Sequence, residues 1–303
     1  MRDFIGVCQN ENIYYDVCQI HFLNPIYAKI ADRLKKISRK VVITPWGSDV
    51  LRAKKYQLRG LRKLVQKSNW VTCTQGSRFE KDIVTLLDIP KEKLYNLPIG
   101  IASIDEILSR PFITDEQAKR VWGFEGKYVI VIGYNGSPAH NHIKVIKSLV
   151  FMKKQLPTNT ILVCPMTYGG NPVYRKKIKR LLWNSQFENQ ILENYLTAEE
   201  LVCLRKATDL FIHAQNTDAN SGTIAEYLLC RKKIVNPTWI TYPHYETYGS
   251  PFYSFSNFEE LPQAIMKAIN DTSNKVSPLL TGNISESGWS KLACKWVELY
   301  KKY

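Results

Sequence analysis

The residues between Asp218 and Glu226 combine the groups that a phosphate- and sugar-binding site needs. Residues 209–235 read DLFIHAQNTDANSGTIAEYLLCRKKIV, a pattern that predicts a strand, a polar loop, a helix and a second strand. Ser221 and Gly222 stand where the helix should begin. Bare backbone N–H groups and the positive end of the helix dipole would meet there, and together they favour phosphate.

Glu226 would lie about one turn into the same helix. A carboxylate at that depth would repel a phosphate unless it points sideways, where it could accept hydrogen bonds from the two adjacent hydroxyls of a ribose. A purely structural interpretation is also open. Ser221 would then cap an ordinary helix, and Glu226 would be a solvated surface acid.

The two acids enclose seven residues, and this spacing resembles the Glu-x7-Glu motif of retaining glycosyltransferases in the family 4 group, with Asp218 in place of the first Glu. The resemblance implies that Glu226 holds the nucleotide ribose and that Asp218 lies beside the donor sugar. It also implies that backbone amides between the two acids hold the diphosphate. This role falls to Ser221, Gly222 and Thr223, with Asn220 in the same donor-binding loop.

Two further segments resemble the donor domain of the same family. Residues 132–149, IGYNGSPAHNHIKVIKSL, are similar to its first strand, loop and helix. Residues 161–174, ILVCPMTYGGNPVY, are similar to the second strand and loop of bacterial transferases that add aminosugars to lipid-linked acceptors. The resemblance implies that the diphosphate faces Gly136, Ser137, Asn141 and His142. The family usually has Lys or Arg at the start of this helix, so His142 would be a weaker cation whose charge depends on pH. Tyr168 would contact donor or acceptor, or only pack in its loop.

The first half of the chain resembles the acceptor domain of these enzymes. The segments that carry this resemblance are YDVCQIHFLNP (15–25), VVITPWGSDVLR (41–52) and LYNLPIGIASID (94–105). His21 and Asp49 each follow a predicted strand, and the carboxyl ends of parallel strands are where α/β proteins bind ligands. Either side chain could therefore orient the acceptor hydroxyl as part of the catalytic set, or serve a structural role.

Short runs rich in Val and Ile alternate with amphipathic stretches along the chain, which predicts parallel, doubly wound α/β sheets. We expect strands at 17–21, 41–44, 70–73, 128–133, 160–165, 190–193, 209–213 and 233–236. The resemblance implies the GT-B fold, with two doubly wound Rossmann-type domains that face a cleft. The strand–helix units that precede the YDVCQIH region in the family are missing from this sequence, so the first sheet is expected to be small or incomplete.

The alternation lapses between residues 98 and 127, where glycines and a proline interrupt the chain, and a fresh apolar strand, YVIVIG, follows. We therefore expect an acceptor-side domain at 1–110, a linker at 111–127 and the donor-binding domain at 128–285. Residues 286–303 are predicted to form an amphipathic helix. The resemblance implies that this helix crosses back to the first domain.

The composition excludes several classes of protein. Hydrophobic residues make up 45% of the 303 residues and charged residues 23%, as in globular proteins. The sequence has no apolar run near the ~20 residues of a membrane span and no signal-peptide pattern, which predicts a cytoplasmic protein. The seven cysteines are scattered without a CxxC pair, so we expect neither a disulfide framework nor a zinc site. No DxD carboxylate pair occurs, and we expect no metal and no cofactor besides the donor, a UDP-sugar.

The net charge of +15 is concentrated in the first half of the chain. Residues 29–67 contain thirteen Lys and Arg against two acids, a local charge of +11. Such a field attracts nucleic acid, an anionic membrane or a phosphorylated substrate, and it can also be a merely solvated helix face. On an acceptor domain it could dock on the inner face of the membrane or hold a lipid-pyrophosphate acceptor. No zinc spacing or RRM-like signature is present, so no nucleic-acid partner is expected.

These observations predict a glycosyltransferase that moves a sugar from a nucleotide-diphosphate sugar to a hydroxyl of a cell-surface glycan or a lipid-linked acceptor. Retention of the anomeric configuration is implied by the resemblance alone. Helix-start amides would stabilise the charge that develops on the leaving diphosphate. Two alternatives remain open: a non-catalytic GT-B-like subunit or truncated paralogue that binds only nucleotide or a partner, and a basic nucleic-acid-binding protein.

Overall fold

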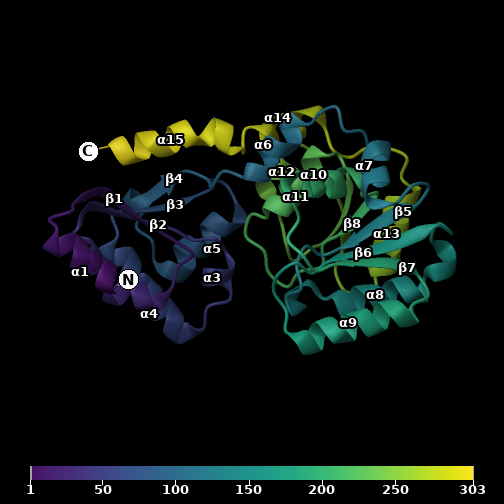
Figure 1. The fold of residues 1–303 in the computed structure, drawn as a ribbon, viewed down its shortest axis with the longest axis horizontal. Helices are drawn as coiled ribbons and strands as arrows, with labels where there is room; N and C mark the ends of the chain where they lie inside the picture. The colour runs from purple at the N-terminus through teal and green to yellow at the C-terminus, as the bar shows by residue number, and fades with distance from the viewer. Residues whose placement is uncertain (1, 303) are drawn as a thin grey trace. The chain divides into compact units, whose positions relative to one another are not determined.

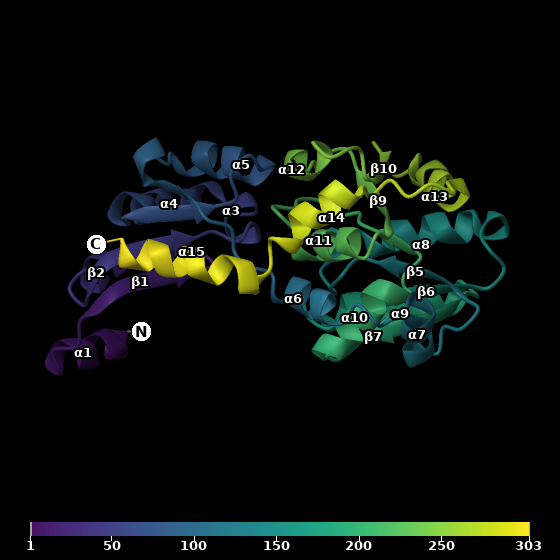
Figure 2. The same cartoon turned by 90° about the horizontal axis from the view of Figure 1, so that it is seen from above.

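A computed structural model describes residues 2–302, which divide into two compact units (Figure 1, Figure 2). The first unit comprises residues 2–100, Thr217–Asn220 and residues 289–302, and the second comprises Ile101–Asn216 and Ser221–Gly288. Each unit is built on one parallel β-sheet, of four strands in the first and six in the second. The chain is therefore α/β with two Rossmann-type domains, as predicted. The division at residue 100 differs from the expected boundary at residue 110, because the helices that follow Gly100 pack in the second unit.

The sheet of the first unit has the order β1-β2-β3-β4. Its strands are β1 (Tyr15–His21), β2 (Ser38–Thr44), β3 (Trp70–Cys73) and β4 (Leu94–Asn96). Strands that follow one another in chain order through right-handed crossovers place all their connecting helices on one face. That face carries α1 (Arg2–Asn10), η1 (Pro25–Lys29), α2 (Ala31–Leu34), α3 (Ser48–Leu51), α4 (Lys55–Lys67) and α5 (Arg78–Leu87), which share one apolar core with the strands.

The other face of this sheet is covered by the last helix, α15 (Trp289–Lys301), which Figure 2 shows lying along the strands. Its buried Leu292, Trp296 and Leu299 pack against Val42 and Leu97. These are the positions that the helical spacing of the sequence places on one stripe. The first sheet is therefore enclosed on both faces only with the help of a segment from the far end of the chain.

The sheet of the second unit has the order β10-β9-β8-β5-β6-β7. Its strands are β5 (Tyr128–Ile132), β6 (Thr160–Pro165), β7 (Glu188–Leu192), β8 (Leu210–Ile212), β9 (Lys233–Pro237) and β10 (Phe252–Phe255). From β5 the chain proceeds outward through β6 and β7, and then returns to the other side of β5 for β8, β9 and β10. This reversal between β5 and β8 is a topological switch point, the place where doubly wound sheets bind ligands.

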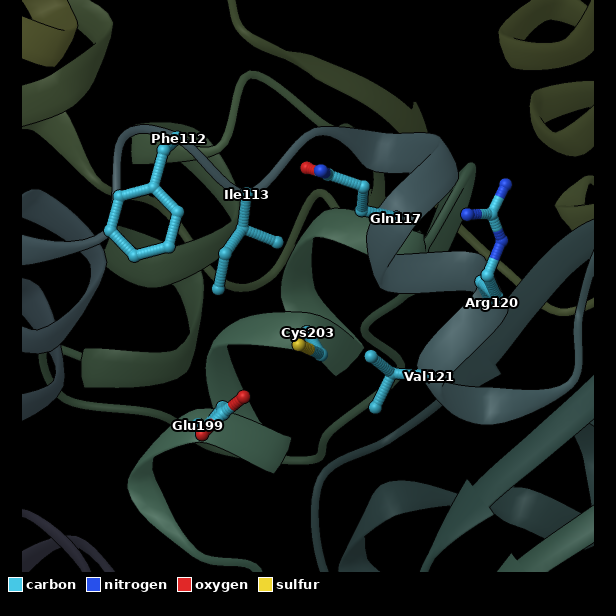
Figure 3. Close-up of a pocket in the computed structure, with 7 residues that line it drawn as sticks. All are labelled: Phe112, Ile113, Gln117, Arg120, Val121, Glu199 and Cys203. Atoms are coloured by element: carbon cyan, nitrogen blue, oxygen red, sulfur yellow. The ribbon is translucent and has the colours of Figure 1, made fainter.

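Helices cover both faces of the second sheet (Figure 1). One face packs against α8 (His142–Phe151), α9 (Pro172–Asn184) and α13 (Leu261–Asn270). The other packs against α6 (Ala102–Ser109), α7 (Asp115–Trp122), α10 (Ala198–Ala207), α11 (Gly222–Leu229) and α14 (Pro278–Ser285), and the short α12 (Pro243–Glu246) adds Tyr245. A pocket of about 330 Å³ lies between α7 and α10, and Figure 3 shows side chains that line it. None of the residues that the sequence singled out lines it.

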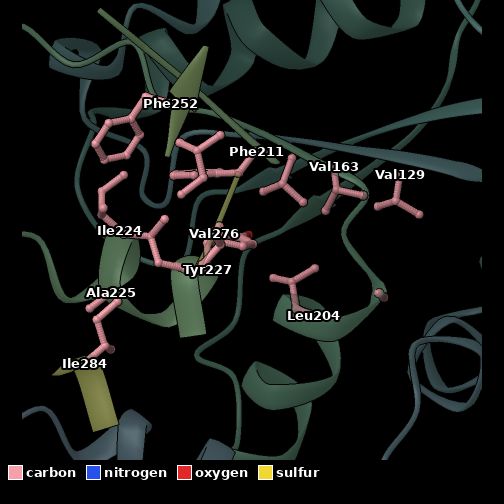
Figure 4. Packing of buried hydrophobic residues seen from close by; sticks show 14 of the residues in the cluster. Val129, Val163, Leu204, Phe211, Ile224, Ala225, Tyr227, Phe252, Val276 and Ile284 are labelled. Atoms are coloured by element: carbon pink, nitrogen blue, oxygen red, sulfur yellow. The ribbon is translucent and has the colours of Figure 1, made fainter. Parts of the chain in front are cut away.

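The core on the α11 side fixes the helix that carries the candidate site (Figure 4). Ile224, Tyr227 and Leu228 of α11 are fully buried against strand residues such as Phe211. The rings of Phe211 and Tyr227 are stacked with their centroids 4.2 Å apart. Since close-packed aromatic pairs leave a helix little freedom to shift, the start of α11 is held at the end of β8.

The eight expected strands are present among the described residues, with ends that differ by a few positions. The short strands β4 and β10 were missed. The expected linker contains α7, which starts with a capping box between Thr114 and Gln117. Within the described residues, no helix is long and apolar enough to cross a membrane. No group of His, Cys, Asp and Glu in that part of the chain is arranged to hold a metal.

Candidate functional site

Two loops of the second unit meet at the switch point, one after β5 and one after β8. The backbone N–H of Asn216 donates to the carbonyl of Ala139 at 2.9 Å. The Asn141 side chain donates from Nδ2 to the Ala214 carbonyl at 2.8 Å and to Asn216 Oδ1 at 2.7 Å. Asn141, predicted to face a diphosphate, therefore ties the two loops together through an uncharged amide.

The loop after β5 is also locked to the loop after β6. The N–H of Gly136 donates to the Tyr168 carbonyl at 2.7 Å, and a side chain at Gly136 would come within 2.8 Å of the Gly169 carbonyl oxygen. Close backbone approach thus requires glycine at position 136. The backbone N–H of Ser137 donates a hydrogen bond to Asn135 Oδ1 at 2.8 Å. The two predicted residues Gly136 and Ser137 therefore lie in a rigid loop at the sheet edge.

Tyr168 is 46% exposed, and its ring lies parallel to that of Tyr195 with the centroids 6.2 Å apart. The pair comes from the loops after β6 and β7, at the same edge of the sheet. Its predicted contact with donor or acceptor stays a prediction.

The start of α11 lacks the side-chain cap that several other helices of the second unit have. Thr114, Thr197 and Ser77 each accept a backbone N–H as the capping residue of α7, α10 and α5. Ser221 occupies the same position before α11, but its side chain makes no capping hydrogen bond. The first N–H groups of α11, which include those of Gly222 and Thr223, are therefore not satisfied by a cap.

Glu226 is buried rather than solvated, with 6% of its surface exposed. Its Oε2 accepts a hydrogen bond from Arg205 Nε at 2.7 Å, and its Oε1 accepts one from the Ser103 hydroxyl. Arg205 also donates to the Tyr227 hydroxyl at 3.1 Å. The carboxylate is thus held between Arg205 of α10 and Ser103 of α6, and its predicted contact with the ribose stays a prediction.

Arg205 carries a permanent charge inside this cluster. Burial alone would lower its pKa, but the neighbouring Tyr227 and Glu226 raise the pKa of Arg205 above its ordinary value. A buried Glu226 is therefore matched by one buried cation. Arg205 and Ser103 were not predicted, because nothing in the local pattern of residues shows that these polar side chains turn inward.

His142 is fully buried, and its Nδ1 lies 3.1 Å from the Tyr174 hydroxyl. Loss of water around the ring lowers the pKa of His142 to about 4. The ring is therefore uncharged near neutral pH, which corrects the expectation of a pH-dependent cation there. Burial beneath the loop, which the sequence could not show, is the physical reason.

A buried polar network that the sequence did not identify supports the loop after β8. His213 Nδ1 lies 2.8 Å from Asn236 Oδ1, and Gln215 Oε1 accepts a hydrogen bond from the Tyr134 hydroxyl at 2.9 Å. Trp239 donates its indole N–H to the Gln215 carbonyl at 2.9 Å. The usable signal was the run of polar residues directly after the buried strand β8.

In the first unit, Asp49 ties the loops after β1 and β2. Its carboxylate accepts the backbone N–H groups of Leu23 at 2.6 Å, Trp46 at 3.0 Å and Gly47 at 2.8 Å. Burial raises the pKa of Asp49, and these backbone donors oppose the rise. The structure thus gives this predicted acceptor-orienting residue a loop-holding position.

His21, the other acceptor-side candidate, is the last residue of β1. Its Nδ1 accepts a hydrogen bond from the indole N–H of Trp46 at 3.2 Å, and partial burial lowers the pKa of His21. The structure does not test its proposed part in catalysis.

Residues 217–220 group with the first unit, although they precede α11 in the chain. Arg52 donates to Thr217 Oγ1 at 3.1 Å and Asn220 donates to Thr74 Oγ1 at 3.2 Å. Asp218 accepts the N–H of Ala219 at 2.9 Å. Asp218 and Asn220 therefore belong to the first unit, whereas the second unit begins again at Ser221. The sequence analysis had placed all the predicted residues from Asp218 to Glu226 in the donor-binding domain.

Comparison with known proteins places the fold. No protein-family model and no curated protein matches the sequence. Among solved structures, a glycosyltransferase from Rickettsia africae is similar with a TM-score of 0.74 and 16% identity, over 99% of this chain and 79% of that one. Anabaena HepE in complex with UDP and glucose has a TM-score of 0.74 and 15% identity, over 100% and 81%. The sucrose-phosphate synthase of Thermosynechococcus elongatus has a TM-score of 0.72 and 14% identity, over 99% and 76%.

These likenesses extend over nearly the whole chain and over both sheets. The fold is therefore α/β and GT-B-like, with two Rossmann-type domains. At sequence identities of 14% to 16%, these similarities establish the fold alone.

Proposed function

We propose that the chain is a nucleotide-sugar-dependent glycosyltransferase with a UDP-sugar as donor. The uncapped start of α11 at the switch point of the second sheet carries this proposal. Doubly wound sheets bind nucleotides at this place, and unsatisfied helix-start N–H groups bind phosphate. The similarity in fold to HepE, described in complex with UDP, and to a glycosyltransferase supports it.

The donor would be held by groups from the second unit. The backbone amides of Ser221, Gly222 and Thr223 would take the diphosphate, with Gly136 and Ser137 in the loop beside it. Glu226 would take the ribose hydroxyls, because a carboxylate has about four acceptor positions and Arg205 and Ser103 use two of them. Asp218 keeps its proposed place beside the donor sugar on the strength of the family resemblance.

The chemistry follows from where charge develops. When the bond from the sugar to the diphosphate breaks, negative charge grows on the leaving β-phosphate oxygen. Fixed N–H groups aimed at that oxygen stabilise the transition state more than the ground state. Retention of configuration, which the Glu-x7-Glu resemblance implies, is part of the proposal and is checked by the anomeric NMR signal of the product.

The proposed acceptor is a cell-surface glycan or a lipid-linked sugar, with the protein in the cytoplasm at the inner face of the membrane. The first unit exposes Lys35, Lys36, Lys54 and Lys55, which could contact anionic lipid. Exchange of all four for Glu should abolish sedimentation with phosphatidylglycerol vesicles. Exchange of Lys176, Lys177, Lys179 and Arg180 in the second unit is the charge-matched control. Equal vesicle binding by both variants and the unchanged protein would contradict membrane docking.

The donor site is tested by thermal unfolding with UDP, UDP-glucose and the diphosphates of the other bases. A ligand that binds the folded state raises Tm by mass action. We expect UDP to raise Tm for the unchanged protein and for Glu199→Ala, an exposed acid on α10, but not for Glu226→Ala. If no nucleotide raises Tm, the donor site is absent, and the non-catalytic alternative is favoured.

A further inference from the structure

Two aromatic side chains are exposed where neighbouring strands of the first sheet end. Phe22 follows β1 directly and Trp46 follows β2 by two residues, and each is 53% exposed. His21 pairs with Thr44 across the last positions of these strands, so the two loops leave the sheet side by side. This is the carboxyl edge of a parallel sheet, where α/β proteins place their ligands.

Trp46 is held in one orientation despite its exposure. Its backbone N–H donates to Asp49 Oδ1 at 3.0 Å, and its indole N–H donates to His21 Nδ1 at 3.2 Å. The indole and imidazole rings meet edge to face, 6.0 Å apart at 82°. An exposed aromatic ring that is already fixed loses little conformational entropy when a ligand covers it.

His21 adds a hydrogen-bond donor beside the indole. Because its Nδ1 accepts the indole N–H, the neutral ring carries its proton on Nε2. Partial burial lowers the pKa of His21, so this neutral form prevails at pH 7. The pair therefore presents a flat apolar face with a polar donor next to it.

The backbone at Phe22 adds a second sign of a specialised loop. Its φ is 57°, in the left-handed region that aromatic residues rarely adopt. Strained backbone of this kind concentrates at sites that bind ligands.

We propose that Trp46 and His21 form a saccharide-binding platform for the acceptor, which rests on the glycosyltransferase function proposed above. A pyranose ring would stack its C–H face on the indole, and one of its hydroxyl oxygens would accept a hydrogen bond from the Nε2–H of His21. Sugars suit this arrangement because they combine an apolar face with a rim of hydroxyl groups. A lipid surface suits it less, because interfacial tryptophans use a free indole N–H, and here that group is bonded to His21.

Saturation-transfer NMR with methyl β-glucopyranoside, methyl β-galactopyranoside and methyl N-acetyl-β-glucosaminide tests the platform. At least one of these glycosides should receive saturation on its ring protons from the unchanged protein. Trp46→Ala should weaken its binding about tenfold, and Trp46→Phe, which keeps an aromatic face, should weaken it less. Trp183→Ala is the control, because Trp183 is 81% exposed on α9 in the other unit.

Equal binding by the unchanged protein and Trp46→Ala would overturn the platform, and so would the absence of binding to all three glycosides. Loss of vesicle sedimentation in Trp46→Ala with unchanged glycoside binding would overturn it in favour of a membrane contact. The Tm shift with UDP is measured on the same samples. If glycoside binding depends on Trp46 while UDP has no effect, the platform stands and the proposed donor site fails.

Discussion

In each sheet one polar side chain connects the two loops at the carboxyl edge, but the chemistry of that side chain differs between the two units. In the second unit the loops after β5 and β8 are tied by the neutral amide of Asn141. In the first unit the loops after β1 and β2 are tied by the carboxylate of Asp49. An anionic tie would repel a diphosphate, whereas it is tolerated beside an uncharged sugar. The nature of the tie therefore fits the ligand proposed for each edge.

The histidines next to the two ligand-binding edges differ in how deeply they are buried. His142 follows the tie of the second unit and is fully buried, with its pKa lowered to about 4. His21 stands at the end of β1 in the first unit, and its side chain is still exposed. Partial burial lowers the pKa of His21. One edge thus hides its histidine as support, and the other presents it to solvent.

The largest expected effect comes from Arg205→Met. This exchange leaves Glu226 buried without its cation and should lower the free energy of unfolding by about 3–5 kcal/mol. Urea denaturation measures the change. The exposed pair of Arg62 and Asp88 is the control, since Arg62→Met should cost less than about 1 kcal/mol. A loss for Arg205→Met no larger than that of the control would show that the buried pair does not hold Glu226.

Acid should destabilise the second unit through His142. The unfolded ring binds a proton at pH 6.5 and the folded ring only near pH 4, so stability is lost as pH falls through this window. Between pH 7 and pH 5 the loss should be about 2 kcal/mol. His142→Phe should remove the contribution of His142 to this loss, as measured by urea denaturation at both pH values. His244→Phe is the parallel variant, because burial lowers the pKa of His244 to about 4 as well.

Exchanging the side chain that ties the loops at each edge, Asn141 in the second unit and Asp49 in the first, should affect UDP binding and glycoside binding separately. Asn141→Asp puts a carboxylate against the oxygens of Ala214 and Asn216. This exchange should lower the free energy of unfolding by about 2 kcal/mol and should also abolish UDP binding. Asp49→Asn removes the oxygen that accepts the Leu23 N–H. This exchange should lower the free energy of unfolding by about 1 kcal/mol and should also abolish glycoside binding. Thermal unfolding and saturation-transfer NMR report both properties. Loss of UDP binding in Asp49→Asn alone would contradict this separation.

The smallest expected change in stability comes from Ser221→Asp, and it should have the opposite sign. An aspartate would cap α11 and interact favourably with its dipole, raising stability by about 0.5–1 kcal/mol. The same carboxylate would occupy and repel the proposed diphosphate position, so the Tm shift with UDP should disappear. Ser277→Asp on α14 is the control, because Ser277 already caps its helix. A stabilised Ser221→Asp that still binds UDP would place the nucleotide elsewhere.

The sequence predicted most of the fold because central strands such as β5 (YVIVI) and β6 (TILVCP) contain short apolar runs between polar, helical stretches. β3 and β6 were predicted with their observed ends, Trp70–Cys73 and Thr160–Pro165. β4 was missed because Leu94–Asn96 is short and half-polar, and its place is set by pairing with β3. The helix at Asp115–Trp122 was taken for linker, although its capping box was visible in the sequence.

The candidate site was predictable only where function depends on backbone and chain order. The small residues at the start of α11 and the acid one turn later could be recognised by spacing. Arg205, Ser103, Asn236 and Trp46 could not be found in that way. Their roles arise from partners between 21 and 123 positions away in the chain, at hydrogen-bond distance only after folding.

The sequence by itself determined that two parallel sheets form and that a glycine-containing helix start follows β8, because local periodicity and turn residues decide such features. Only the tertiary structure decided that Ser221 leaves this helix uncapped, that Arg205 matches the buried Glu226, and that His142 is neutral. It also decided that residues 217–220 join the first unit. Burial and pairing depend on contacts between distant segments, and no local pattern of residues encodes them.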